Sequence, residues 1–189
     1  MFSFLMVTLD GYYEGPNREF DFWVVDDEFN EFSAAQLEEV DALVFGRVTY
    51  EGMAAYWPTP AAVEDDPRVA ARMNGLPKIV VSRTLDRAEW SNTRLVDTPD
   101  ALTALKQEPG GDIAILGSSD LTVSLLQLGL VDELRIMVNP VVLGSGRSVF
   151  KTATERIGLK LVERRDFESG NVLLRYHPDH PGVLRPQQH

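Results

Sequence analysis

The stretch DIAILGSSDLTVSLLQLG, residues 112–129, contains a strand, a tight turn and a helix in direct succession. Residues 112–116 form an apolar run of the kind found in strands that are buried on both faces. Gly117-Ser118-Ser119 follows as a turn, and three leucines then recur at the spacing of one helix face: Leu121, Leu125 and Leu128. Because a buried strand that runs directly into a helix is the repeating unit of α/β proteins, this stretch predicts a parallel sheet.

Apolar runs of the same character lie on both sides of this unit. Strands are expected at five further places: residues 2–9, 41–45, 78–82, 94–96 and 134–138. Helices are expected between them: residues 33–40, 49–57 and 68–73, and from Thr98 to the stop at Pro109. Four prolines mark residues 57–77 as a loop that holds the helix at 68–73: Pro58, Pro60, Pro67 and Pro77. At the end of the chain, residues 159–167 and 172–176 flank Ser169-Gly170-Asn171, which predicts an antiparallel hairpin. The expected fold class is α/β, with a mostly parallel mixed sheet between helices and this C-terminal hairpin at its edge.

The segment between the first two strands is acidic and aromatic and shows no clean periodicity. We expect residues 12–33 to form a long loop with one short helix. The helix expected at 33–40 has Ser33 in the N-cap position and Gln36 where a capping box would place it.

The inventory of titratable residues excludes several kinds of site. The chain has 189 residues, no cysteine and three histidines, His177, His180 and His189, all in the last thirteen residues. A thiolate nucleophile, a Cys-ligated metal and a Ser-His-Asp triad in the folded body are therefore excluded. No metal site is expected. If the protein is an enzyme, a cofactor, carboxylates, hydroxyls or backbone groups must carry its chemistry.

The charge is concentrated at one end of the sequence. The net charge is −11, and residues 1–66 hold 15 acids against only Arg18 and Arg47, a net of −13, while the remainder is near neutral. Since no basic stripe is present, no nucleic-acid partner is expected. The N-terminus has no basic region before its apolar run, and no apolar run reaches the length of a membrane span, so we expect a cytoplasmic protein without a membrane partner.

Three predicted strand ends carry small or phosphate-compatible residues: Gly46-Arg47-Val48-Thr49, Ser82-Arg83-Thr84 and Gly117-Ser118-Ser119. Ligands of α/β sheets bind where strands end and helices begin, because free N–H groups point outward there. Three such corners on one sheet suggest a dinucleotide. Each corner has an ordinary reading too, as a turn glycine, a surface arginine or a pair of N-cap serines. The Rossmann glycine pattern is absent, and Gly144-Ser145-Gly146-Arg147 is interpreted as a tight connection between strands.

Six ordered motifs give the chain a more specific resemblance. They are VTLDGY from Val7, FGRVTYE from Phe45, PKIVVSRTL from Pro77, ILGSSDL from Ile115, LVDEL from Leu130 and PVVLGSG from Pro140. Together they resemble the dihydrofolate reductase-like family that includes the C-terminal reductase domain of riboflavin-biosynthesis deaminase-reductases. The match covers residues 2–176. We therefore expect residues 1–176 to form a single domain and residues 177–189 to form a flexible tail.

The resemblance implies a three-layer fold and an NADPH-dependent reductase that acts on a small molecule and is often a homodimer. In such proteins the loop matching Gly46, Arg47 and Thr49 holds the pyrophosphate and the 2′-phosphate. The loop matching Ser82, Arg83 and Thr84 receives the adenosine. The segment matching Gly117, Ser118, Ser119 and Leu121 runs under the nicotinamide. Two positions depart from the family: Ser118 replaces the second glycine of a Gly-Gly pair, and Asp120 stands where a basic residue can help to bind phosphate.

The substrate side is less defined by the sequence. Asp10, at the end of the first strand, and Asp27, with Asp26 as its neighbour, are the candidate catalytic carboxylates. Asp10 is equally well explained as part of an Asp-Gly turn. Tyr56 and Trp57 would supply an aromatic wall for a planar heterocycle, or belong to the core.

Three functions remain open from the sequence. The leading hypothesis is hydride transfer from NADPH to a pterin-like or pyrimidine-like heterocycle or a carbonyl compound. Two of the three functions are forms of this hypothesis. The first is a ribosylaminopyrimidine reductase of the riboflavin pathway, although no deaminase domain accompanies it here. The second is a dihydrofolate-type reductase, although a single clear carboxylate is missing. The third is a non-catalytic nucleotide-binding protein that retains the fold.

Overall fold

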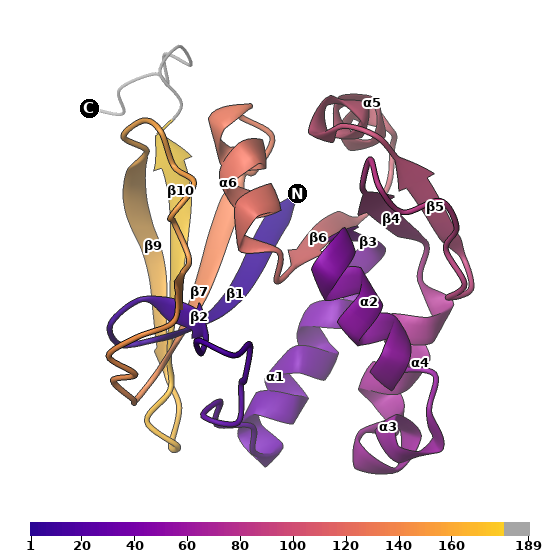
Figure 1. The fold of residues 1–189 in the computed structure, drawn as a ribbon. Coiled ribbons are helices and arrows are strands. Elements are labelled where there is room, and N and C mark those ends of the chain that lie inside the picture. The colour runs from indigo at the N-terminus through magenta and orange to yellow at the C-terminus, as the bar shows by residue number, and fades with distance from the viewer. Residues whose placement is uncertain (180–189) are drawn as a thin grey trace.

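An eight-stranded sheet forms the centre of the computed structural model, which describes residues 1–179 (Figure 1). The strand order is β5-β4-β3-β6-β1-β7-β10-β9. All pairings from β5 to β7 are parallel, and β10 pairs antiparallel with both β7 and β9. The fold class and the C-terminal hairpin are thereby confirmed. The strands are β1 (Phe2–Thr8), β3 (Val40–Gly46), β4 (Lys78–Val81), β5 (Thr93–Val96), β6 (Asp112–Leu116), β7 (Glu133–Asn139), β9 (Gly158–Asp166) and β10 (Val172–Asp179).

Helices cover both faces of the sheet. On one face lie α1 (Asp27–Glu38), α2 (Arg47–Tyr56) and α4 (Pro67–Gly75), and α3 (Pro60–Asp65) packs on α4. On the other face lie α6 (Ser119–Gln127) and α5 (Leu102–Gln107), which follows the 3-10 turn η1 (Pro99–Ala101). Helix, sheet and helix make the three layers of the expected fold.

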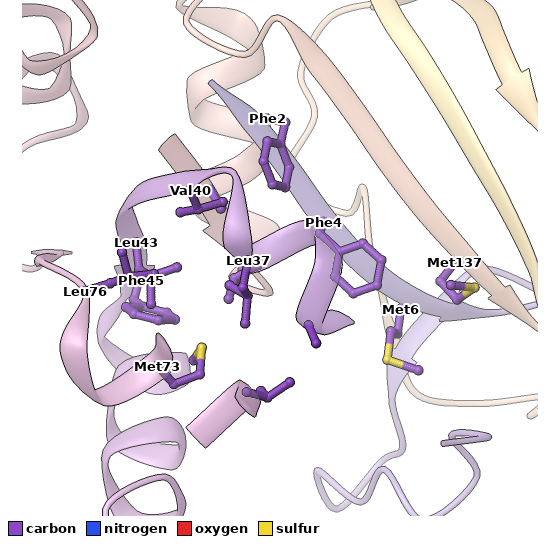
Figure 2. Packing of buried hydrophobic residues seen from close by; sticks show 14 of the residues in the cluster. Phe2, Phe4, Met6, Leu37, Val40, Leu43, Phe45, Met73, Leu76 and Met137 are labelled. Carbon is purple, nitrogen blue, oxygen red and sulfur yellow. The ribbon is translucent and has the colours of Figure 1, made fainter. Parts of the chain in front are cut away.

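Alternation along β1 divides the core into two clusters. Phe2, Phe4 and Met6 enter the cluster under α1, which Figure 2 shows, whereas Leu5 and Val7 enter the cluster under α6. Successive side chains of a strand point to opposite faces, so a central strand covered on both faces is mostly apolar. All seven residues of β1 are buried. The apolar runs identified in the sequence are the central strands for this reason.

The start of the first helix differs from the prediction. Helix α1 begins at Asp27 rather than near Ser33, and Asp26 is its N-cap, accepting a hydrogen bond from the Phe29 N–H at 2.8 Å. Phe29 and Phe32, three residues apart, pack on the same face against Phe4. The aromatic residues that concealed the helical pattern are therefore its buried face. The expected loop over 12–33 also contains a short strand, β2 (Tyr12–Glu14), which pairs with β8 (Arg147–Ser148).

Prolines between residues 58 and 67 start helices where the sequence suggested mostly loop. Pro60 and Pro67 occupy the first turns of α3 and α4, with Thr59 and Asp66 as N-caps. Proline suits this position because the first N–H groups of a helix have no partner within it. The interpretation of these prolines as loop markers was wrong for α3.

The C-terminal strand is longer than expected. β10 continues to Asp179, with His177 opposite Lys160 and Asp179 opposite Gly158 on β9. The expected end of this strand at residue 176 is corrected accordingly, and residues 180–189 of the predicted tail lie outside the described residues. Among the helices of residues 1–179, none has the length and apolar character needed to cross a membrane.

Candidate functional site

The ends of β3, β4 and β6 meet at one edge of the sheet. The three strands are parallel neighbours, with Gly46 opposite Val81 and Val44 opposite Ile115. Helix α2 leaves this edge directly after β3, and helix α6 leaves it after β6 (Figure 1). The three predicted corners are therefore adjacent in space, as their positions at parallel strand ends suggested.

Two of the corners are in direct contact. The Gly46 N–H donates to the Ser118 hydroxyl at 2.8 Å. A Cβ added at Gly117 would lie 3.1 Å from the Thr49 methyl carbon, and one at Gly46 would lie 3.2 Å from the Ser118 hydroxyl oxygen. The two glycines thus allow the β3–α2 and β6–α6 connections to approach backbone to backbone, and side chains there would separate them.

The backbone at Gly117 and Ser118 turns sharply. Both residues are left-handed, with φ of 59° and 57°, and this turn directs the chain from β6 into α6. Left-handed conformation costs a serine more than a glycine, of the order of 1 kcal/mol. The hydrogen bond from Gly46 holds Ser118 in place. No cis peptide bond occurs among residues 1–179.

Helices α2 and α6 start without a side-chain cap. Their N-cap residues are Gly46 and Ser118, and neither forms a capping side-chain hydrogen bond. The first N–H groups of each helix, together with the positive end of its dipole, are left for another acceptor. Two such helix ends in contact form a favourable environment for phosphate oxygens.

The two predicted arginines differ in their surroundings. Arg47, on the first turn of α2, donates from Nη1 to both carboxylate oxygens of Glu51 at 2.9–3.0 Å, and its side chain is 43% exposed. Arg83, which follows β4, is exposed and has no ion pair within residues 1–179. Ser82 accepts hydrogen bonds from the N–H groups of Thr84 and Leu85, so its hydroxyl shapes the loop that carries Arg83.

Ser119 and Leu121 lie beneath the contact rather than on its surface. Both are buried, and Leu121 packs in the cluster under α6, with its Cβ 3.9 Å from the Cβ position of Gly46. Their side chains therefore support the loops, while their N–H groups belong to the first turn of α6.

Asp10 occupies a structural position. Its carboxylate accepts hydrogen bonds from the Thr8 hydroxyl at 2.7 Å and from the N–H groups of Leu143 and Gly144 at 3.1 and 2.8 Å. These bonds, that from Thr8 foremost, lower the pKa of Asp10 below its usual 3.8. A carboxylate in this state is ionised at neutral pH and is a poor proton donor. Asp10 joins the end of β1 to the loop after β7.

The three carboxylates at the start of α1 differ in their hydrogen-bond partners. Asp26 caps the helix, Asp27 is exposed on its first turn, and Glu28 accepts hydrogen bonds from Arg165 at 3.0 Å and from the Glu168 N–H at 2.9 Å. The structure brings Glu28, not Asp27, against the β9–β10 hairpin. Nothing in the sequence distinguishes Glu28, because its partners are more than a hundred residues away.

Two buried asparagines, which the sequence analysis missed, hold the segment before α1. Asn139 accepts from the Val24 N–H at 2.9 Å, and Asn171 donates to the Val24 carbonyl at 2.9 Å. Both are fully buried. Nearby, Trp23 Nε1 and Asn171 Oδ1 are buried without a hydrogen-bond partner within residues 1–179. One hydrogen-bond donor and one acceptor therefore remain unpaired where this segment packs beside β7 and β10.

Tyr56 and Trp57 do not lie at these loops. They lie at the far end of α2, where the Tyr56 hydroxyl donates to Asp65 and Trp57 packs against the core cluster under α1. The core reading holds for Trp57, whereas Tyr56 is exposed, and the aromatic wall stays a prediction.

A final cluster surrounds the start of α6. Arg147 on β8 forms ion pairs with Asp120 at 2.6 Å and with Glu14 at 3.6 Å. Its guanidinium carbon lies 5.8 Å from the centre of the Tyr13 ring. Burial raises the pKa of Tyr13, while a hydrogen bond with Ser119 acts in the opposite direction. The sequence signal for this cluster was the LGSGR segment, which had been interpreted only as a connection.

Comparison with known proteins agrees with this architecture. Residues 1–173 match the family model of the RibD C-terminal domain. The chain is 34% identical over 176 residues to the uncharacterized protein YyaP of Bacillus subtilis (strain 168), covering 92% of each sequence.

Solved structures show the same fold at lower identity. A putative riboflavin biosynthesis protein from Shewanella sp. PV-4 superposes with a TM-score of 0.69 at 21% identity, over 95% of this chain and 98% of that one. Dihydrofolate reductase from Enterococcus faecalis, complexed with NADP(H), gives 0.63 at 16% identity, over 95% and 96%. On the evidence of the family match over nearly all of the described residues, the chain belongs to the RibD C-terminal domain family.

Proposed function

We propose that this protein is an NADPH-dependent reductase that transfers a hydride to a small conjugated heterocycle or carbonyl compound. The observation that carries the proposal is the contact between two helix starts without side-chain caps, joined by the Gly46–Ser118 hydrogen bond. The family supports the reductase class, and one protein of the same fold is complexed with NADP(H).

The residues present fit a dinucleotide phosphate. Gly46 and Gly117 keep the two loops free of side chains, so phosphate oxygens would reach the N–H groups of α2 and α6. Arg83 is without an ion pair in the described chain, and Arg47 would exchange Glu51 for the 2′-phosphate. A guanidinium bound to a phosphate forms charge-assisted, often bidentate hydrogen bonds, which would favour NADPH over NADH.

The reduction itself would draw on the cofactor, which supplies the hydride when bound. The protein would position the two reactants and exclude water. Apolar side chains stand exposed at the end of β1 and beside it: Leu9, Phe20, Val25 and Val142. Such a surface, together with the unpartnered indole N–H of Trp23 and side-chain amide oxygen of Asn171, suits a planar heterocycle with polar edges.

A second candidate is a nucleotide-binding protein without catalysis. It is favoured because the carboxylates of Asp10, Asp26 and Glu28 already form hydrogen bonds within the protein. Among the predicted catalytic carboxylates only Asp27 is unengaged within residues 1–179. Single-turnover absorbance at the NADPH band, with a pterin, a pyrimidinone and a quinone as acceptors, separates the two: oxidation of NADPH supports the reductase, and binding without oxidation of NADPH supports the second candidate.

Cofactor binding is tested by titrating NADPH while tryptophan fluorescence is followed. Saturable quenching in the micromolar range is expected, as is usual for cofactor and substrate sites. Failure to bind NADPH at millimolar concentration would reject both candidates that depend on this nucleotide.

A further inference from the structure

Asp120 stands in an unfavourable place for a phosphate-binding helix. It lies in the first turn of α6, directly after Ser119, and its side chain is 49% exposed. A carboxylate at a helix N-terminus is attracted to the same positive end that would bind a phosphate. An unpaired Asp120 would therefore compete with an anionic ligand and repel it.

The structure shows that both oxygens of this carboxylate are engaged. Arg147 Nη2 donates to Asp120 Oδ2 at 2.6 Å, and the Thr152 hydroxyl donates to Oδ1 at 3.3 Å. The other terminal nitrogen of Arg147 lies 3.6 Å from Glu14, a buried carboxylate. One guanidinium therefore offsets two negative charges beside the start of α6.

The loop before Arg147 is built to deliver this guanidinium. Gly146 has a φ of 151°, and a Cβ there would collide with the Glu14 carbonyl oxygen. Only glycine permits β8 to lie this close to β2, and the pairing of Glu14 with Arg147 fixes the register of the two short strands. The segment that looked like a plain connection thus sets the position of one arginine.

We propose that Arg147 is a positioning residue of the cofactor site. It holds the Asp120 carboxylate in an ion pair, so that the α6 N-terminus remains available to the phosphate oxygens of a dinucleotide. This inference rests on the proposed function, because it assigns the α6 N-terminus to the pyrophosphate. Arg147 acts through Asp120 and is not itself required to touch the ligand.

The test is a double-mutant cycle read as the dissociation constant of NADPH. Arg147→Met frees Asp120 and is expected to weaken NADPH about tenfold at low ionic strength. Asp120→Asn removes the competing charge and is expected to tighten binding about twofold to threefold. The double variant should return to within about threefold of the wild type, because without the carboxylate the arginine has nothing to neutralise.

A purely structural role for Arg147 gives the opposite pattern. The double variant would then be as weak as Arg147→Met, and that result, or an Arg147→Met variant that binds like the wild type, overturns the proposal. Arg164→Met is the matched control, since it breaks the exposed Arg164–Asp166 pair on β9 and should leave NADPH binding unchanged. If Arg147→Met fails to fold, tighter binding by Asp120→Asn still supports the proposal, and weaker binding contradicts it.

The proposed function and this inference fail separately. If the wild type does not bind NADPH, the proposed function is rejected. The same variants are then titrated with inorganic pyrophosphate by phosphorus NMR. Weaker binding by Arg147→Met with recovery in the double variant supports the electrostatic role, and equal binding by all four proteins rejects it.

Discussion

Helices α1 and α4 begin with aspartate caps, whereas α2 and α6 begin with Gly46 and Ser118 and have no side-chain cap. Asp66 alone accepts from two N–H groups of α4, those of Arg68 and Val69, both at 3.0 Å. The four helices face the same requirement, to find acceptors for their first N–H groups. In α1 and α4 an aspartate side chain supplies the acceptor. Helices α2 and α6 have no such acceptor, and their N-terminal ends are in contact with each other.

Under the proposed function, this difference separates helix starts that stabilise the fold from helix starts that bind a ligand. A capped helix start contributes to folding through its own side chain. An uncapped start forgoes that contribution and keeps its donors for a ligand. The comparison therefore predicts that caps can be added or removed with opposite effects on stability and on NADPH binding.

The largest effect is expected from giving α2 a cap of its own. Gly46→Asp would place a carboxylate on the N–H groups proposed for phosphate, and NADPH binding should fall by about 100-fold or more. The free energy of unfolding should change by no more than about 1 kcal/mol, since the new cap offsets the closer contact with Ser118. NADPH titration and thermal unfolding measure the two quantities.

Gly46→Ala adds the same Cβ without the carboxylate and is the control for this variant. Its Cβ would lie 3.2 Å from the Ser118 hydroxyl, so a smaller loss of affinity is expected. Equal losses in both variants would show that crowding, not capping, is responsible.

A smaller effect is expected at Arg47. Arg47→Ala removes the proposed 2′-phosphate contact and should weaken NADPH about tenfold, with NADH nearly unchanged. The lost pair with Glu51 is exposed and contributes only about 0.3–0.5 kcal/mol to stability. Isothermal titration with the two cofactors measures the ratio. If both weaken equally, Arg47 has no role at the 2′-phosphate.

Removing the aspartate cap from a capped helix, α4, should change the stability of the protein and leave NADPH binding unchanged. Asp66→Ala leaves two N–H groups of α4 without their acceptor and is expected to cost about 1 kcal/mol of unfolding free energy. Its NADPH dissociation constant should match that of the wild type. Urea denaturation gives the first value, and weakened NADPH binding would contradict the division proposed here.

The smallest effect is expected on the acid stability of the fold, through Glu133, whose carboxylate is hydrogen-bonded to two arginines. Burial alone would raise the pKa of Glu133, but hydrogen bonds from Arg175 and Arg135 outweigh it and hold the pKa below its usual 4.5. Its contribution to stability is therefore complete at neutral pH and is lost as the pH falls from about 4.5 through the folded-state pKa. Thermal unfolding from about pH 6 to pH 3 should show a shallower acid decline in Glu133→Gln than in the wild type. Parallel declines would show that Glu133 does not contribute.

The sequence was most informative where local pattern and burial coincide. Apolar runs ending in Gly46 and Gly117 located β3 and β6, and parallel strands necessarily bring their ends to one edge. The start of α1 was missed because Phe29 and Phe32 pack inward beneath a run of acids. The ribbon of β2 and β8 was missed because strands of two or three residues carry no periodicity of their own.

The partners of the charged groups lay beyond reach of local pattern. Arg147 finds Asp120 across 27 residues, and Asp10 finds Gly144 across 134. Such pairs depend on the completed fold. The sequence therefore marked Asp10 as a candidate carboxylate but did not predict its hydrogen bonds to the loop after β7. The homodimer implied by the family resemblance stays a prediction.

The outer strand β9 has a consequence for solubility. It is the edge of the sheet, eight of its nine residues are exposed, and Leu161 and Val162 are among its exposed apolar side chains. An open edge of this length invites further strands and aggregation. The register shift opposite Arg175 and Tyr176 leaves Val162 without a partner on β10, and such a bulge bends the strand. With charged side chains on both sides of it, the edge is a poor template for fibril growth.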